Sequence, residues 1–135
     1  MTPDHYQRLE TLFSTAPCNQ IYDITYIARE GEGEVILNIT PELLHGGGVV
    51  HGSIIFKTLD DAATIAGMSL LKDAATLTST FNIYFIRPIV SGQLRAVGKV
   101  IRMGRRQIIA EAIATDADGR EIARGSGTFM TVPIK

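Results

Sequence analysis

Residues 45–53 read HGGGVVHGS, and residues 54–63 continue without a break as IIFKTLDDAA. The three consecutive glycines give the backbone access to unusual dihedral angles and let a ligand approach it closely. His51 and Gly52 then stand where a helix is expected to begin, so free backbone N–H groups and the positive end of the helix dipole face whatever binds there. Two adjacent aspartates interrupt the apolar run that follows. This combination predicts a functional site built on a helix.

The helix is expected to run from Gly52 to about Leu71, because its apolar side chains recur at i, i+4 and i+7. It is apolar over most of its girth, which favours burial inside a domain over a position on the surface. A shorter amphipathic helix is expected near the N-terminus, over residues 3–14, with His5 on the solvated side.

The remaining regular patterns predict strands, separated by turn residues. The expected strands cover residues 21–28, 34–39, 76–86, 93–102, 107–115 and 121–132, with a turn at 31–33 between the first two. Two strands, one buried helix and a four-strand antiparallel meander predict an α+β fold, in which an antiparallel sheet wraps around the central helix. We expect residues 1–135 to form a single domain.

Composition and charge narrow the class of function. Hydrophobic residues make up 45% and charged residues 20% of the chain, as in ordinary soluble globular proteins. The formal net charge of -1 argues against nucleic-acid binding and against a polybasic membrane-binding surface. The single Cys18 suits a reducing compartment, and no metal-ligand spacing surrounds it. Neither a signal peptide nor a spanning run of ~20 apolar residues is recognised, so we expect a cytoplasmic protein.

The order and spacing of these motifs resemble the hotdog fold and, within it, the PaaI-like acyl-CoA thioesterases. The core motif of that family reads approximately N-x-x-G-x-x-H-G-G, followed after six residues by D/E-x-A. Gly48 matches the first glycine of this motif, and His51-Gly52 match the H-G pair. Asp60, nine positions after His51, matches the acid, and Ala62 matches the final alanine.

Further matches extend this resemblance over most of the chain, from about Gly33 to Val132. Thr78 falls where several members carry a catalytic Ser or Thr, and residues 84–88, YFIRP, resemble the family's Y-x-R-P strand end. The turn at 104–106 and the final hairpin at 118–125 also resemble the family's pattern. The chain departs from it twice: His45 stands where the family usually has Asn or Gln, and Ser53 replaces the second glycine of H-G-G.

The motif residues can support thioester hydrolysis, which needs a polarised carbonyl and an activated water or a carboxylate nucleophile. The Gly52 backbone N–H, at the helix N-terminus, is expected to bind the oxyanion. Asp60 is expected to act as general base on water or to attack the carbonyl and form an anhydride, unless it only accepts hydrogen bonds from a neighbouring strand. Asp61 has Lys57 at i−4 and is expected at a polar edge. Asp60 shares its helical stripe with Phe56, a poorly solvated environment that would raise its pKa.

Helix geometry adds a condition on the site. His51 and Asp60 are nine residues apart, which corresponds to ~13 Å along a helix and to opposite faces. Within one chain they cannot act on the same carbonyl, because hydrogen-bond reach is only ~3 Å. If both are catalytic, the acid comes from a second subunit, with two equivalent sites in a homodimer. The resemblance implies the same shared site, and a tetramer formed as a dimer of dimers stays open.

The remaining candidate residues have structural alternatives. His51 would orient the substrate carbonyl or only the loop, and His45 would contact the thioester or only cap the loop. Thr78 would position water, or belong to a polar strand face with Thr76 and Thr80 at period two. The spacing of His45, His51 and Asp60 matches no common metal-ligand pattern, so neither a metal nor another cofactor is expected.

The remaining contacts are assigned to the substrate. Gly48, Ser53 and Asp61 are expected to line its binding site. Three arginines around one turn would grip the phosphates of coenzyme A, or only form a solvated hairpin: Arg102, Arg105 and Arg106. The sequence therefore predicts a metal-independent acyl-CoA thioesterase that acts as a homodimer. The alternatives are a non-catalytic acyl-CoA binder or sensor and, ranked last, a dehydratase or hydratase acting on an acyl thioester.

Overall fold

The computed structural model describes residues 1–133 and contains two long helices and six strands. In chain order these elements are α1 (Pro3–Thr15), β1 (Asp23–Arg29), β2 (Glu32–Asn38), α2 (Gly52–Met68), β3 (Ala74–Phe85), β4 (Gln93–Met103), β5 (Gln107–Thr115) and β6 (Glu121–Pro133). Two short 3₁₀ turns, η1 (Pro17–Asn19) and η2 (Pro41–Leu43), lie between them. No helix in residues 1–133 has the length and apolar character needed to cross a membrane.

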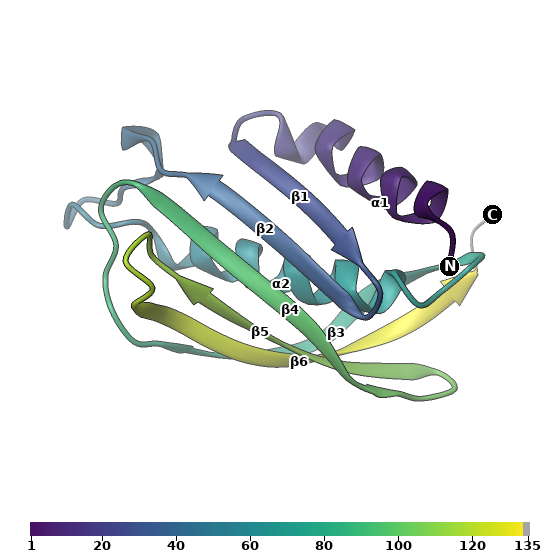
Figure 1. Ribbon diagram of the computed structural model, residues 1–135. Coiled ribbons are helices and arrows are strands. Elements are labelled where there is room, and N and C mark those ends of the chain that lie inside the picture. Colours follow the sequence, from purple (N-terminus) through teal and green to yellow (C-terminus); the bar gives the residue numbers. More distant parts are fainter. Residues whose placement is uncertain (134–135) are drawn as a thin grey trace.

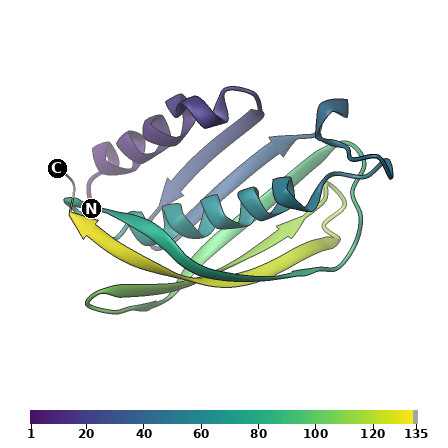
Figure 2. The same cartoon turned by 180° about the vertical axis from the view of Figure 1, so that it is seen from behind.

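The six strands form one antiparallel sheet that curves around α2, while α1 lies beside β1 (Figures 1 and 2). Leu59, Ala62 and Ile65 of α2 are fully buried against this sheet, which explains why the helix is apolar over most of its surface. The predicted α+β fold, with an antiparallel sheet wrapped around a central helix, is confirmed.

The predicted four-strand meander is wrong in one respect. The strand order is β1-β2-β4-β5-β6-β3, so β3 pairs with β6 at the edge of the sheet and does not neighbour β4. The segment between β3 and β4, residues 86–92, is too long for a tight hairpin and instead crosses the end of the sheet. It is anchored there by a hydrogen bond from the Val50 N–H to the Ile89 carbonyl, 2.9 Å long.

Some element boundaries also differ from the predicted ones. α2 ends at Met68, three residues before the predicted end, because residues 69–71 continue in a turn. The first hairpin turns at Gly31, with φ of +68°, so residues 32 and 33 already belong to β2. The C-terminal boundary of the last strand, predicted at residue 132, falls at Pro133.

α2 approaches the sheet most closely over a pair of glycines. Gly33 of β2 and Gly98 of β4 face each other in register. A Cβ atom would lie 2.3 Å from the Ala62 carbonyl oxygen at Gly33 and 2.5 Å from the same atom at Gly98. No side chain fits at these distances, so the two glycines determine how deeply α2 lies in the sheet.

α1 is fastened to the C-terminal end of α2 by a histidine. The prediction that His5 is solvated is wrong, because the residue is 6% exposed. Its Nε2 lies 3.1 Å from the Met68 carbonyl oxygen, and Arg8 donates to its Nδ1 over 3.1 Å. The last carbonyls of a helix lack intrahelical partners, and the imidazole N–H satisfies one of them. The short-range pattern of α1 contains no sign of this contact.

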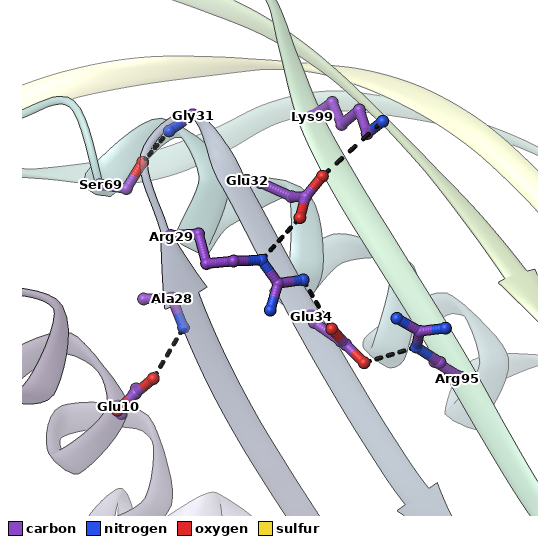
Figure 3. A network of polar contacts seen from close by, with 9 residues as sticks. All are labelled: Glu10, Ala28, Arg29, Gly31, Glu32, Glu34, Ser69, Arg95 and Lys99. Atoms are coloured by element: carbon purple, nitrogen blue, oxygen red, sulfur yellow. Dashed lines mark hydrogen bonds and ion pairs between the residues drawn. The ribbon is translucent and has the colours of Figure 1, made fainter.

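An ion-pair network joins three strands on the face of the sheet that points away from α2 (Figure 3). The Glu34 carboxylate on β2 is buried, and Arg29 of β1 and Arg95 of β4 donate to it over 2.6 and 2.5 Å. Glu32 accepts from Arg29 over 2.7 Å and lies 3.7 Å from the Lys99 ammonium. Hydrogen bonds from the Arg95 and Arg29 guanidiniums hold the pKa of Glu34 below its ordinary value, despite burial.

Candidate active site

The N-terminus of α2 presents the first group of predicted site residues. His51 is the N-cap, and its Nδ1 accepts a hydrogen bond from the Ser53 backbone N–H over 3.0 Å. Gly52 is the first helical residue, and nothing in residues 1–133 accepts a hydrogen bond from its backbone N–H. A Cβ at Gly52 would lie 3.4 Å from the Phe85 ring, so β3 ends against this turn. The Gly52 N–H is therefore free to bind an anionic oxygen.

The glycine loop folds back so that its two histidines lie together. The Gly48 N–H donates to the His45 carbonyl over 2.9 Å, and Gly48 itself has φ of +81°. His45 accepts a hydrogen bond at Nδ1 from the Gly47 N–H over 2.8 Å. The His45 and His51 rings meet edge to face, with centroids 6.0 Å apart. Because both Nδ1 atoms accept backbone N–H groups, each neutral ring carries its proton on Nε2 and offers a donor there.

Asp60 lies in the middle of α2 and turns toward β3. Its Oδ1 accepts a hydrogen bond from the Thr78 hydroxyl over 2.8 Å. Desolvation by burial raises the pKa of Asp60, the Thr78 hydrogen bond lowers it, and the neighbouring Asp61 charge raises it again, so that the pKa lies above its ordinary value. The direction of this shift agrees with the predicted environment, but Asp60 is only half-buried and Phe56, on the same helical stripe, is 38% exposed. The structure also brings Thr78 to Asp60, which the sequence pattern left undecided.

Asp61 points to the other side of α2, toward α1 and β1. Its Oδ2 accepts hydrogen bonds from the Tyr26 hydroxyl over 2.8 Å and from the Lys57 ammonium over 2.9 Å. The predicted contact with Lys57 is confirmed, but Tyr26 was not anticipated. The alternating pattern of β1 could have indicated this contact, because it places Tyr26 on the buried face of the strand. Burial and the Asp61 charge raise the pKa of Tyr26, so its hydroxyl stays protonated and donates.

The candidate residues do not all meet within one chain. His51 and Asp60 are the N-cap and ninth residue of α2, and Asp60 turns toward β3 rather than toward the glycine loop. Within residues 1–133, no three His, Cys, Asp or Glu side chains are grouped so that they could hold a metal ion. The β4–β5 turn lies at the opposite end of the molecule from the N-terminus of α2 (Figure 1). Arg105 and Arg106 lie in this turn, and Arg102 precedes it at the end of β4.

Comparison with known proteins identifies the family to which the chain belongs. Residues 47–123, more than half of the chain, match the model of the thioesterase superfamily. The chain belongs to the thioesterase superfamily. A Saccharolobus solfataricus protein whose name proposes an esterase is 29% identical, over 98% of this chain and 96% of its own length. Membership of this superfamily supports hydrolase activity.

Solved structures of similar proteins have the same fold as this chain. A thioesterase family protein from Silicibacter pomeroyi matches with a TM-score of 0.87 and 27% identity, over 96% of this chain and 98% of its own. The PaaI protein from the phenylacetic acid degradation operon of E. coli has the same fold, with a TM-score of 0.87 and 22% identity over 97% and 96% of the two chains. The predicted resemblance to PaaI-like hotdog thioesterases is confirmed at the level of superfamily and fold.

The stretch of the chain that matches the superfamily model contains nearly all of the candidate site. It includes the His51-Gly52 pair, Asp60 and Thr78, whereas His45 lies two residues before it. His45 therefore has to be interpreted from its own contacts, which make it a hydrogen-bond donor at Nε2.

Proposed function

We propose that the protein hydrolyses acyl-CoA thioesters without a metal or another cofactor, in the cytoplasm and as a homodimer. The observation that supports this most strongly is the Asp60 carboxylate, whose pKa burial raises and which Thr78 holds in place. A desolvated carboxylate is a stronger base or nucleophile than a solvated one, and its raised pKa brings it closer to neutral pH. The Gly52 N–H on the same helix offers the matching oxyanion contact.

The dimer is supported by the free edge of β3. This strand has twelve residues and, within residues 1–133, pairs only with β6. Leu77, Tyr84 and Phe85, which lie on it, are large apolar side chains with more than half of their surface exposed. Pairing β3 with its two-fold copy would join the two sheets and place two antiparallel α2 helices side by side. Asp60 of one subunit would then approach Gly52 of the other. Within one chain the two residues cannot meet, because they lie too far apart along α2.

In this shared site the thioester carbonyl oxygen accepts the Gly52 N–H, and the Nε2–H donors of His45 and His51 orient the substrate. Ionised Asp60 removes a proton from water as the water attacks, or attacks the carbonyl itself to form an anhydride that water then cleaves. The C–S bond breaks, and the thiolate leaves and takes up a proton as free coenzyme A. Either route yields the carboxylic acid and CoA–SH.

The phosphates of coenzyme A would bind to the β4–β5 turn of the second subunit. Within one chain this turn lies beyond the C-terminal end of α2 (Figure 1). Antiparallel packing of two α2 helices brings that end of one subunit toward the glycine loop of the other. Guanidinium groups suit phosphate oxygens, and we therefore assign this contact to Arg102, Arg105 and Arg106. Gly48 and Ser53 are assigned to the substrate because Gly48 lies in the glycine loop and Ser53 lies in the first turn of α2.

Thiol release from a panel of acyl-CoAs, followed with DTNB, tests the proposal. Asp60→Asn should fold and lose most turnover, while Asp61→Asn should retain much more, because Asp61 faces α1 and β1 instead of Thr78. Wild-type rates in Asp60→Asn would overturn the assignment. Saturable binding of acyl-CoA without thiol release would identify a non-catalytic binder on the same fold. Sedimentation of the wild type at micromolar concentration tests the dimer, and a monomer would contradict the shared site.

A further inference from the structure

Ser53 carries a hydroxyl group that the proposed mechanism does not use. The core motif of the PaaI-like family has glycine at this position, so the hydroxyl is a departure of this chain from that motif. Ser53 is exposed in the first turn of α2, and its Oγ lies 2.7 Å from Nδ1 of the exposed His51. A nucleophilic side chain therefore lies within hydrogen-bond reach of a base.

The backbone determines which of the two side chains donates in this contact. The Ser53 N–H donates to His51 Nδ1 over 3.0 Å, so this nitrogen offers a lone pair and carries no proton. The Ser53 hydroxyl is therefore the donor, and its hydrogen points at the imidazole. In this arrangement a histidine can activate a serine, because the base is unprotonated and already holds the proton that it has to remove.

The same turn supplies donors for the oxygen of an attacked carbonyl group. The Gly52 N–H has no acceptor among residues 1–133. The N–H groups of a first helical turn point out of the helix N-terminus, so the Ser53 N–H lies beside it. Once His51 Nδ1 takes up the hydroxyl proton, it no longer accepts the Ser53 N–H, which becomes available to the oxyanion. In serine hydrolases the backbone N–H of the nucleophile itself serves in this way.

These groups belong to three consecutive residues of one chain, residues 51–53. Asp60 and Gly52, by contrast, meet only across the proposed dimer, because they lie too far apart along α2. A reaction at Ser53 therefore needs neither the second subunit nor the Asp60 carboxylate. Ser53 and His51 are both exposed, so an ester reaches them from solvent.

We propose that Ser53, activated by His51, is an acyl-accepting nucleophile and gives the protein a second activity, the hydrolysis of aryl esters. Ser53 Oγ bonds to the carbonyl carbon, its proton moves to His51 Nδ1, and the oxyanion accepts the Gly52 N–H. The bond between the carbon and the phenolic oxygen breaks, and His51 returns the proton to the phenol. Water then attacks the acyl–Ser53 ester, gives one proton to His51 and releases the carboxylic acid. The same proton restores the Ser53 hydroxyl.

The test uses the Asp60→Asn variant, which lacks the carboxylate of the proposed thioesterase site, and two probes. Phenylmethanesulfonyl fluoride forms a stable ester with an activated serine, so peptide mass spectrometry should find this adduct on Ser53 whatever the rate of deacylation. p-Nitrophenyl acetate reports turnover through the release of p-nitrophenol. Adding Ser53→Ala should abolish both signals. The matched control is Ser14→Ala, since Ser14 is also exposed but donates to the Thr11 carbonyl over 3.3 Å and not to a base.

A second variant tests the role of the imidazole. His51→Asn keeps a preferred N-cap residue at the start of α2 and removes the base. It should slow both adduct formation and p-nitrophenol release by about a hundredfold or more. Equal rates with and without His51→Asn would overturn the proposed activation of Ser53.

The outcome for Ser53 is separate from the outcome for the proposed thioesterase, which thiol release from acyl-CoA measures. An adduct on Ser53 and p-nitrophenol release that Ser53→Ala abolishes support the inference even if the wild type releases no thiol. Unlabelled Ser53, or p-nitrophenol release that Ser53→Ala leaves unchanged, refutes it even if the protein is an active thioesterase.

Discussion

Gly98→Ala should show how strictly the position of α2 is determined by the sheet. The new Cβ would lie 2.5 Å from the carbonyl carbon and oxygen of Ala62 and 2.6 Å from the nitrogen of Ala63, all of them backbone atoms. Ordinary contacts begin at 3.4 Å, so helix and sheet must separate by about 0.9 Å. Because no flexible side chain can yield, we expect a loss near the upper end for overpacked cores, about 3 kcal/mol.

The same displacement of α2 should also lower kcat/KM. Asp60 lies two residues from Ala62, so an outward shift of α2 would lengthen its hydrogen bond with Thr78. A misplacement of about 1 Å costs on the order of a hundredfold in rate. Urea unfolding followed by circular dichroism measures the stability, and DTNB measures kcat/KM. The matched control for stability is Gly46→Ala, where an added Cβ meets nothing within 4 Å. A Gly98→Ala variant as stable as this control and as active as the wild type would refute the reasoning.

Three further predictions concern single groups. Thr78→Val removes the hydrogen bond that lowers the pKa of Asp60, so the acid limb of the kcat/KM profile should move to higher pH. If the acid limb does not move, the Thr78 hydroxyl does not influence the group that titrates there. Glu34→Gln should cost about 1–2 kcal/mol at pH 7, with solvent screening of its half-exposed arginines included. The lowered pKa of Glu34 means that this stability exists above the unfolded-state value, ~4.3, and is lost as pH falls through the folded-state value. Equal costs at pH 7 and pH 3 in urea unfolding would contradict the ion-pair origin. For His45, long-range ¹H–¹⁵N spectra should show the Nε2–H tautomer, and an Nδ1–H pattern would exclude the hydrogen bond from Gly47.

The sequence could predict those parts of the fold that depend on local periodicity. The apolar repeat of α2 and the alternation within each strand are visible over ten to fifteen residues, and so are the glycine loop and the His51 N-cap. The partner of β3 could not be predicted in this way, because it is β6, about fifty residues later in the chain. Local patterns indicate that a strand exists but not which strand lies beside it.

The same distinction between local patterns and long-range contacts applies to the candidate site. Asp60 could be selected because its helical stripe is apolar, and burial raises its pKa in the direction that this pattern predicts. Its hydrogen bond with Thr78 and the Tyr26 contact of Asp61 join residues 18 and 35 positions apart. His5 was placed wrongly for the same reason, because its partner is a carbonyl group at the end of another helix. Residue type and spacing identified candidate groups, and only the tertiary structure paired them.

The free edge of β3 has a consequence for the handling of the protein. Its sequence, AATLTSTFNIYF, has no charged residue and no proline, and such a long uncharged edge is a template for aggregation. If β3 pairs with its copy in the proposed dimer, a subunit that loses its partner on dilution or heating exposes this edge, so stability should depend on protein concentration. Substitutions that weaken this proposed pairing should therefore be recognised first as poor solubility in the cell, before any loss of the proposed hydrolysis can be measured.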